Sequence, residues 1–399
     1  MGMRVRLRAG SPHPQADPVL VAALTAGVDA ADALGSTGPT LDALVRLQRR
    51  GRLEWSVDGA SAIPLRPGAP WPDAHPASAA LSRFAIVRRD TDGWLVESGR
   101  SPWQVRLGAD AFALLPHLTS QAARDLRALL ALAGMLAEHD DDPAALGWEP
   151  HDRYFATWSR SDAPQPAGYR LGDVRPAEPA RRTDLPDGPR IALPVPSGPR
   201  ADEPTLWEAA ESRRSLREFA DVPVPLADLG ELLWRTLRVI RVLPADDDVP
   251  YDRILRPVPS GGAMHATELW LVCTRVEDVP AGVWRYDPFT HELVGHGGDG
   301  PRPAAALTRM RDADGVSPPV MALVTTRHAR TSWKYGGIAL ALELKDVGVL
   351  MAAVQLTAGA LGLGMCPWGS GPVDELARLL GVDPEIDMPV GEFVLGVPG

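Results

Sequence analysis

The sequence predicts an α+β protein built from more than one domain, and three observations lead to this expectation. Its 399 residues exceed the length that one hydrophobic core usually organises, and 45% of them are apolar, which suffices to fill several cores. Segments with helical spacing and segments with strand composition occur in both halves of the chain. A proline-rich stretch separates the halves, so we expect four parts: residues 1–75, 76–160, 161–203 and 204–399.

The first two parts each combine a helix with a hairpin. In the first part, residues 40–50 carry leucines at helical spacing, and two short strands follow around the turn at residues 58–59. In the second part, two strands meet at the hairpin signal of residues 90–93, and a leucine-spaced helix is expected at 121–138. Both parts are therefore predicted to be small winged-helix-like α+β units.

Winged helices often bind DNA, but this sequence disfavours nucleic acid as a partner. Neither unit carries a concentrated basic helix, and the formal net charge of the whole chain is −10. We expect these units to bind a peptide or to serve a structural purpose.

Residues 161–203 predict a long extended connection rather than regular structure. Prolines recur throughout the stretch, with glycines and charged residues between them, and proline interrupts both helices and sheets. Connections of this length are uncommon unless they are functional or disordered. Our interpretation is a linker that wraps a neighbouring subunit.

Residues 204–399 predict one α+β domain in which helices flank a central mixed sheet. Helices are expected at residues 206–215, 225–240, 304–311, 347–364 and 373–381. Strands are expected at residues 268–275, 320–326 and 391–397, with a hairpin over 282–296.

Residues 347–364 contain no charge and approach the length of a membrane span. Charged residues lie directly before the stretch and glycines interrupt it, which favours a helix buried on all sides within a large domain. The chain starts without the apolar run of a signal peptide, and its two cysteines, Cys273 and Cys366, make no metal or disulfide framework. We therefore expect a cytoplasmic protein with no metal site and no membrane partner.

Two segments of the last part are candidates for binding a ligand. Arginines and a hydroxyl crowd residues 213–217, and such groups are the donors that a phosphate and a polyol chain need. In residues 256–265, prolines and paired glycines predict a rigid turn where the backbone can approach a flat ring closely. Taken singly, the first could be a solvated arginine cluster and the second an ordinary turn.

Lysine is rare in this chain. Of 41 basic residues only Lys334 and Lys345 are lysine, and all others are arginine. Arginine replaces lysine on a solvated surface but not where a compact amine must lose its proton. Lys334 is therefore a candidate catalytic residue, whereas Lys345, at the charged start of the long helix, is expected to be a surface or salt-bridge residue.

The arginine segment, the glycine loop and the glycine-rich residues 358–364 occur in the order and spacing of the nitroreductase flavoprotein family, which the last part resembles. The resemblance implies a nitroreductase-like domain that binds FMN, in a homodimer with two FMN sites at the subunit interface. It implies that the ribityl phosphate is held by Arg213, Arg214, Ser215 and Arg217. It also implies that Pro259, Ser260 and Gly261 line the isoalloxazine ring and that the backbone near Gly369 and Ser370 faces flavin N5.

The adjacent Lys334 and Tyr335 point to a subfamily. They resemble the Lys-Tyr pair of SagB-type azoline dehydrogenases, which mature thiazoline and oxazoline rings in ribosomally made peptides. Residues 81–160 are similar to the region that precedes the flavin domain in those enzymes. The resemblance implies that Lys334 and Tyr335 are catalytic, that a modified precursor peptide is the substrate, that a cyclodehydratase is a partner and that O2 reoxidises the flavin.

The chemistry of ring oxidation explains the pair. Turning an azoline into an azole removes a proton from one ring carbon and a hydride from its neighbour, and the hydride goes to flavin N5. A lysine partly desolvated beside the flavin is expected to have its pKa lowered toward neutrality and to serve as the base. Tyr335 is then a hydrogen-bonding partner or an alternate base.

One region departs from the pattern of these dehydrogenases. Residues 340–353 are largely apolar where polar residues are usual, which affects the expected substrate but not the fold. Two alternatives stay open: an FMN-dependent oxidoreductase of another small molecule, and a non-catalytic scaffold that binds a leader peptide within a peptide-modifying complex.

Overall fold

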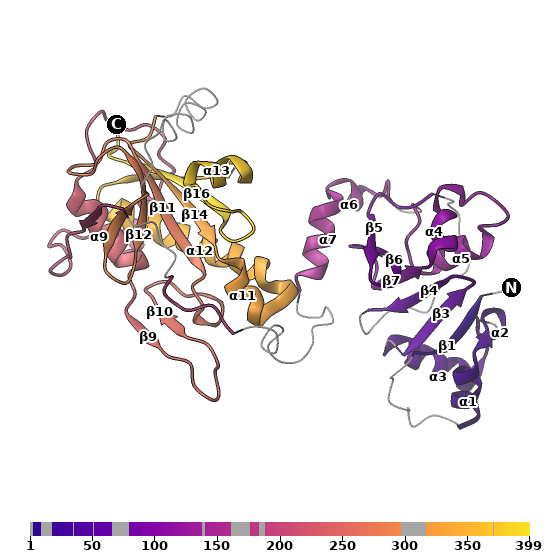
Figure 1. Ribbon diagram of the computed structural model, residues 1–399. Helices are drawn as coiled ribbons and strands as arrows, with labels where there is room; N and C mark the ends of the chain where they lie inside the picture. Colours follow the sequence, from indigo (N-terminus) through magenta and orange to yellow (C-terminus); the bar gives the residue numbers. More distant parts are fainter. Residues whose placement is uncertain are drawn as a thin grey trace. The chain divides into compact units, whose positions relative to one another are not determined.

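The computed structural model of the chain describes residues 3–8, 18–34, 36–50, 52–65, 80–137, 140–160, 176–182, 188–296, 317–369 and 371–399. The chain divides into two compact units, Met1–Gln165 and Pro166–Gly399 (Figure 1). The helix expected at residues 304–311 lies outside the described residues.

The first unit is built on one seven-stranded antiparallel sheet, with the strand order β2-β1-β3-β4-β7-β6-β5. Its strands are β1 (Arg4–Leu7), β2 (Val28–Asp29), β3 (Leu53–Val57), β4 (Ala60–Pro64), β5 (Ala85–Asp90), β6 (Gly93–Ser98) and β7 (Trp103–Leu107). Its helices are α1 (Pro18–Ala26), α2 (Ala30–Leu34), α3 (Gly38–Arg49), α4 (Ala109–Ala113), α5 (Arg124–Leu132), α6 (Pro143–Leu146) and α7 (Pro150–Trp158), with a 3₁₀ turn η1 (Leu115–His117).

This sheet joins the two predicted winged-helix-like units into one. Helix α3 precedes the β3–β4 hairpin as expected, but β4 then pairs with β7, with Ala62 opposite Val105. Trp55 from the first half and Leu129 from the second belong to the same buried cluster. Pairing the hairpin edges buries both apolar faces in a single core, which is why a boundary at residue 75 has no structural counterpart.

The second unit contains a seven-stranded sheet with the order β15-β16-β14-β11-β12-β13-β8. Its strands are β8 (Arg190–Ala192), β11 (Thr267–Cys273), β12 (Gly282–Asp287), β13 (Glu292–Gly295), β14 (Val320–Thr326), β15 (Gly364–Trp368) and β16 (Met388–Gly396). A separate pair is formed by β9 (Arg241–Leu243) and β10 (Arg253–Leu255). All pairings between the strands of the seven-stranded sheet are antiparallel, so the expectation of a mixed sheet is wrong. The short β11–β12 and β12–β13 connections allow only antiparallel neighbours.

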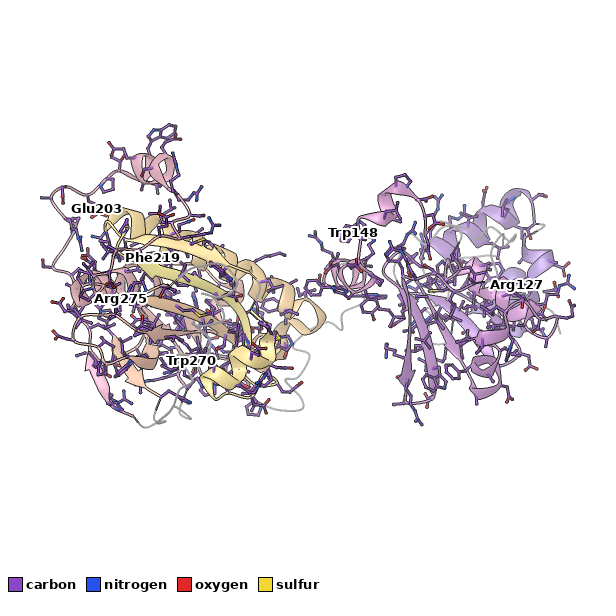
Figure 2. All side chains as sticks on the ribbon, turned by 90° about the horizontal axis from the view of Figure 1, so that it is seen from above. Arg127, Trp148, Glu203, Phe219, Trp270 and Arg275 are labelled. Atoms are coloured by element: carbon purple, nitrogen blue, oxygen red, sulfur yellow. The ribbon has the colours of Figure 1, made fainter. Side chains whose placement is uncertain are left out.

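Helices cover both faces of this sheet, which confirms the predicted α+β class (Figure 1). Along β11, Leu269 and Leu271 point to the face covered by α9 (Leu226–Leu237) and α12 (Ala339–Ala360), while Trp270 points to the face covered by α13 (Val373–Leu380). Trp270, labelled in Figure 2, is only 2% exposed. Side chains of a strand alternate between faces, so a strand covered on both sides is apolar throughout.

The long helix α12 is not buried on all sides as predicted. Its side chains Val347, Leu350 and Val354 lie in the core, but Leu344 and Val349 are each 42% exposed. A single sheet covers only one face of a helix, so an apolar sequence does not by itself imply burial all round. In the part of the chain that the structure describes, no helix has the length and apolar character needed to cross a membrane.

The predicted linker packs partly on the second unit. Residues 190–192 form the edge strand β8, which pairs with β13, so this stretch is not wholly irregular. Pro189 and Pro194 flank the strand, and proline is tolerated at such an edge position. Residues 161–175 and 183–187 of the linker lie outside the described residues.

Candidate active site

Helix α11 (His328–Tyr335) carries the Lys-Tyr pair at its last turn, and Arg330 anchors this helix. The Arg330 side chain is fully buried and donates to the carbonyl oxygens of Met264 and Asp252, each at 2.7 Å, and to that of Glu178. Burial lowers the pKa of Arg330 to about 10. One guanidinium therefore ties α11 to both sides of the glycine loop and to the linker.

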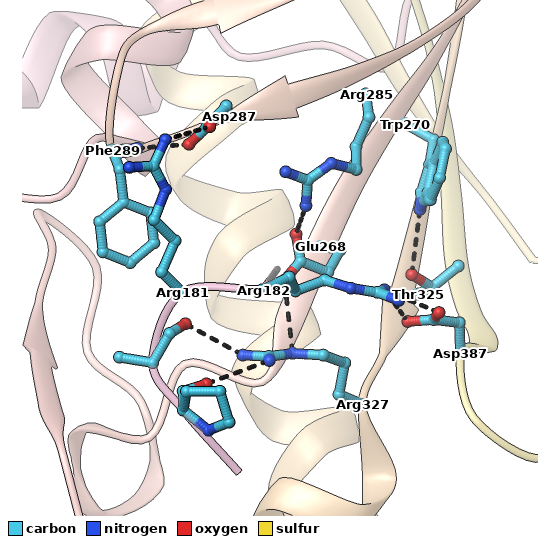
Figure 3. Close-up of polar contacts among 12 residues, drawn as sticks. Arg181, Arg182, Glu268, Trp270, Arg285, Asp287, Phe289, Thr325, Arg327 and Asp387 are labelled. Carbon is cyan, nitrogen blue, oxygen red and sulfur yellow. Dashed lines mark hydrogen bonds and ion pairs between the residues drawn. The ribbon is translucent and has the colours of Figure 1, made fainter. Parts of the chain in front are cut away.

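An ion network fixes the start of α11 (Figure 3). Arg327 donates to the carbonyl oxygens of Pro179 and Ala180 at 3.2 and 3.1 Å, and its Nε lies 3.4 Å from a carboxylate oxygen of Glu268. Arg285 pairs with the same Glu268 at 2.5 Å, and both side chains are buried. The linker segment is held by Arg182, which pairs with Asp387 at 2.6 Å.

The glycine loop and the Lys-Tyr pair come together. Gly262 has φ +61, and a Cβ built on it would lie 2.6 Å from the Tyr335 hydroxyl oxygen, 3.1 Å from the Tyr251 hydroxyl oxygen and 3.2 Å from Lys334 Nζ. Only glycine combines a positive φ with so close an approach. Lys334 Nζ also lies 4.8 and 5.0 Å from the ring centroids of Tyr251 and Tyr335.

The charge state of Lys334 differs from the prediction. Burial, the largest influence, disfavours the ammonium form, but the hydrogen bond to the Tyr251 hydroxyl and the two neighbouring tyrosines outweigh it. The pKa of Lys334 is therefore raised above its usual value, not lowered toward neutrality. The sequence could not reveal this, because Tyr251 precedes Lys334 by 83 residues.

The loop itself is held by a carboxylate that the sequence did not single out. Ser260 Oγ donates to Asp346 Oδ2 at 2.6 Å, and the Gly261 amide donates to the same carboxylate at 3.2 Å. Ser260 Oγ also accepts from the His265 amide at 3.0 Å. Burial raises the pKa of Asp346, although the Ser260 hydrogen bond opposes the shift. The Ser260 hydroxyl thus stabilises the loop, while Pro259 is exposed beside it.

The arginine segment, residues 213–217, contacts α12 at a point distant from the glycine loop. It follows α8 (Leu206–Ser212), and the Arg214 carbonyl accepts from Gln355 Nε2 at 3.5 Å. Gln355 and Asp346 are nine residues apart, which corresponds to roughly 14 Å along a helix. The side chains of the predicted phosphate donors are exposed: Arg213, Arg214, Ser215 and Arg217.

The last predicted site residues follow β15. Gly369 is exposed, and a Cβ added to it would meet no described atom within 4 Å. Ser370 lies outside the described residues. Nearby, the Gly371 amide donates to Glu392 Oε1 at 2.6 Å, which ties this turn to β16.

Three residues of the site were missed by sequence reasoning: Tyr251, Arg330 and Asp346. Each acts through a partner that is distant in the sequence, so no local motif marks it. The scarcity of tyrosine, with five in the chain, was the one signal that could have drawn attention to Tyr251.

The helix-flanked sheet defines a nitroreductase-like α+β fold for the second unit. Residues 210–397 match the family model of the nitroreductase family, so this unit contains a nitroreductase family domain. Flavoproteins of this family use FMN, which supports the predicted cofactor.

Individual proteins are similar to this part of the chain. A provisionally named nitroreductase of Methanocaldococcus jannaschii is 27% identical over 198 residues, which cover 49% of this chain and 95% of that protein. A provisionally named nitroreductase of Desulfovibrio desulfuricans, crystallised with FMN, is 18% identical, with a TM-score of 0.33. The match covers 49% of this chain and 88% of that protein's chain. One chain of the McbBCD microcin synthetase complex of Escherichia coli, with truncated pro-MccB17 bound, is 18% identical, with a TM-score of 0.40. The match covers 52% of this chain and 78% of that chain.

Proposed function

We propose that this chain is an FMN-dependent dehydrogenase that oxidises azoline rings of a modified peptide to azoles. The observation that carries the proposal is the approach of Lys334 and Tyr335 to Gly262, which puts candidate bases against the loop proposed to line the isoalloxazine ring. An ordinary reductase has no use for a base at this point, whereas ring oxidation needs one.

The residues present fit FMN. The glycine loop has no side chain at Gly261 and Gly262, so its backbone can approach a flat ring closely. The exposed side chains of Arg213, Arg214, Ser215 and Arg217 carry groups that can donate to a phosphate. When bound, FMN supplies the hydride acceptor. We propose Pro259, Ser260 and Gly261 for the ring and the backbone near Gly369 and Ser370 for its N5 edge, with Ser260 contributing through the loop that it stabilises.

We propose Lys334 and Tyr335 as the groups that accept the proton removed from the ring. The ring loses one proton to the base and one hydride to the cofactor, so one H2 leaves each ring. Lys334 can accept a proton only after losing its own, and its raised pKa makes the neutral amine a minor form near neutrality. Tyr335, whose hydroxyl also faces Gly262, is the alternate acceptor.

A homodimer is part of the proposal. Helix α12 exposes the apolar side chains Leu344 and Val349, and α8, which contacts α12, exposes Leu206 and Trp207 at 76% and 75%. Exposed large apolar side chains on two neighbouring helices are typical of an association surface. We also propose that the first unit binds the leader segment of the peptide and that a cyclodehydratase supplies the azoline.

A direct test uses the purified chain and a synthetic thiazoline peptide. We expect visible flavin absorbance and a product lighter by one H2 per ring, detected by mass spectrometry. A colourless protein that FMN cannot reconstitute would favour the scaffold alternative and overturn the proposal.

One observation favours a second candidate, an FMN-dependent oxidoreductase of another small molecule. Leu342 on α12 faces the glycine loop, since its Cβ would lie 3.6 Å from a Cβ added to Gly261. Leu342 lies within residues 340–353, the stretch that is largely apolar where the azoline dehydrogenases usually have polar residues. A yellow protein that leaves thiazoline and oxazoline peptides unchanged would support this second candidate.

A further inference from the structure

We propose that Tyr251 is the positioning residue of Lys334, holding its amine and directing it toward Gly262 and Tyr335. This inference rests on the proposed function only in naming Lys334 as the base. The contact itself is direct, because Lys334 Nζ lies 2.6 Å from the Tyr251 hydroxyl oxygen.

The hydrogen bonds of Tyr251 have a fixed direction. Its hydroxyl donates to the Gly262 carbonyl oxygen at 3.1 Å, and a hydroxyl has only one proton to donate. Towards Lys334 it can therefore only accept. An ammonium and a neutral amine both satisfy this contact with one N–H, and in the neutral amine the lone pair must point away from Tyr251. Tyr251 thereby leaves the lone pair of Lys334 available to a substrate.

Tyr251 is itself held rigidly. It is 3% exposed and packs in a small cluster with Met264 and Trp333, meeting the Trp333 ring edge-on at a centroid distance of 6.0 Å. The next residue, Asp252, accepts from Arg330 through its carbonyl oxygen. Arg330 and Lys334 are one helical turn apart on α11, so residues 251–252 form hydrogen bonds with two neighbouring positions on the same face of this helix.

The electrostatic surroundings agree with this role. The groups that face Lys334 are the hydroxyls of Tyr251 and Tyr335, with Arg330 one turn earlier on α11 and Asp346 of α12 engaged with the glycine loop. After burial, the Tyr251 hydrogen bond is the largest influence on the pKa of Lys334, and it raises that pKa. Removing the hydroxyl should therefore make the amine easier to deprotonate.

The chain offers an unusually direct test, because Lys334 and Lys345 are its only lysines. Protein labelled with ¹⁵N-lysine gives two side-chain signals, which Lys345→Arg assigns. We expect Tyr251→Phe to move the titration of Lys334 to lower pH while the Lys345 signal is unchanged. Tyr154→Phe is the matched control, since it removes a hydroxyl bonded to Glu97 in the first unit and should leave Lys334 unaffected. An unchanged Lys334 midpoint in Tyr251→Phe overturns the proposal.

A second measurement covers the case in which Tyr251→Phe fails to fold. In the wild-type chain labelled in the same way, the hydrogen-bonded Lys334 amine should be held rigidly, so its ¹⁵N signal should relax faster than that of the exposed Lys345. Equal relaxation of the two signals contradicts the proposal.

These titrations need no azoline substrate, so their outcome tests the contact of Tyr251 with Lys334 independently of the proposed function. Where the thiazoline peptide is turned over, Tyr251→Phe should lower kcat by about a hundredfold with little change in KM, because the base is misplaced rather than the substrate. A change confined to KM counts against a positioning role.

Discussion

At the scale of single residues, the properties of the site come from contacts that are distant in the sequence. The rarity of lysine indicates Lys334 as a candidate base, but its hydrogen bond to Tyr251 and the neighbouring Tyr335 raise its pKa against the effect of burial. The prediction that its pKa is lowered rested on burial alone. The hydroxyl groups of Tyr251 and Tyr335 outweigh the effect of burial.

The raised pKa of Lys334 predicts a particular pH dependence. Ring oxidation needs the neutral amine, and below the pKa its fraction grows about tenfold with each pH unit. Turnover should therefore rise steadily from neutral to alkaline pH, as measured by product formation under saturating peptide. A rate that is flat or that falls over this range would exclude Lys334 as the base.

A substitution at Gly262 tests the close packing of the loop. Gly262→Ala places a methyl group against Tyr335 and Lys334 and strains a left-handed backbone, so we expect loss of turnover and about 1–3 kcal/mol of unfolding free energy. Gly362→Ala is the matched control, because Gly362 has φ +76 but a Cβ there would meet no described atom within 4 Å. Equal effects on turnover would show that backbone strain alone, without the contact, is responsible.

At the scale of elements, the sequence predicted those whose patterns are long and regular. β11 and β14 are apolar because both faces of the sheet are covered. The helix predicted at residues 347–364 overlaps α12, which begins eight residues earlier and ends four residues earlier. The three-residue strand β8 was not predicted, since a strand so short between prolines has no periodicity. The exposed apolar side chains of α12 could not be predicted either, because apolar residues occur on all sides of the uncharged part of this helix, residues 347–360.

The anchoring of α11 gives a prediction for stability. Arg330→Met should lower the free energy of unfolding by about 3 kcal/mol or more, because three buried carbonyl groups lose their donor. Urea denaturation measures the change. The comparison is Arg190→Met, which removes an exposed ion pair with Glu292 and should cost at most about 1 kcal/mol. Similar losses in both variants would contradict the anchoring role.

At the scale of the whole molecule, the chain joins a nitroreductase family domain to a separate compact unit. The sequence predicted two separate units in the first 160 residues, because each half has its own helix and hairpin. Only the pairing of β4 with β7 reveals one sheet, and pairing between distant strands leaves no mark on local composition.

The proposed homodimer leads to a further prediction. Val349→Asp puts a charge on the exposed apolar face of α12 and should convert a dimer to a monomer in size-exclusion chromatography with light scattering. Ile386→Asp, which changes another exposed apolar side chain at 53% exposure, should leave the dimer intact. A monomeric wild-type chain would refute the dimer.

The proposal that Lys334 is the base of an FMN-dependent azoline dehydrogenase is tested most directly by mixing oxidised protein with a thiazoline peptide without oxygen. We predict that flavin absorbance bleaches in the wild type and in Lys345→Ala, and that bleaching slows by about 10²–10⁴-fold in Lys334→Ala while the flavin stays bound. Bleaching at the wild-type rate in Lys334→Ala, or none in the flavin-loaded wild type, would contradict the proposal.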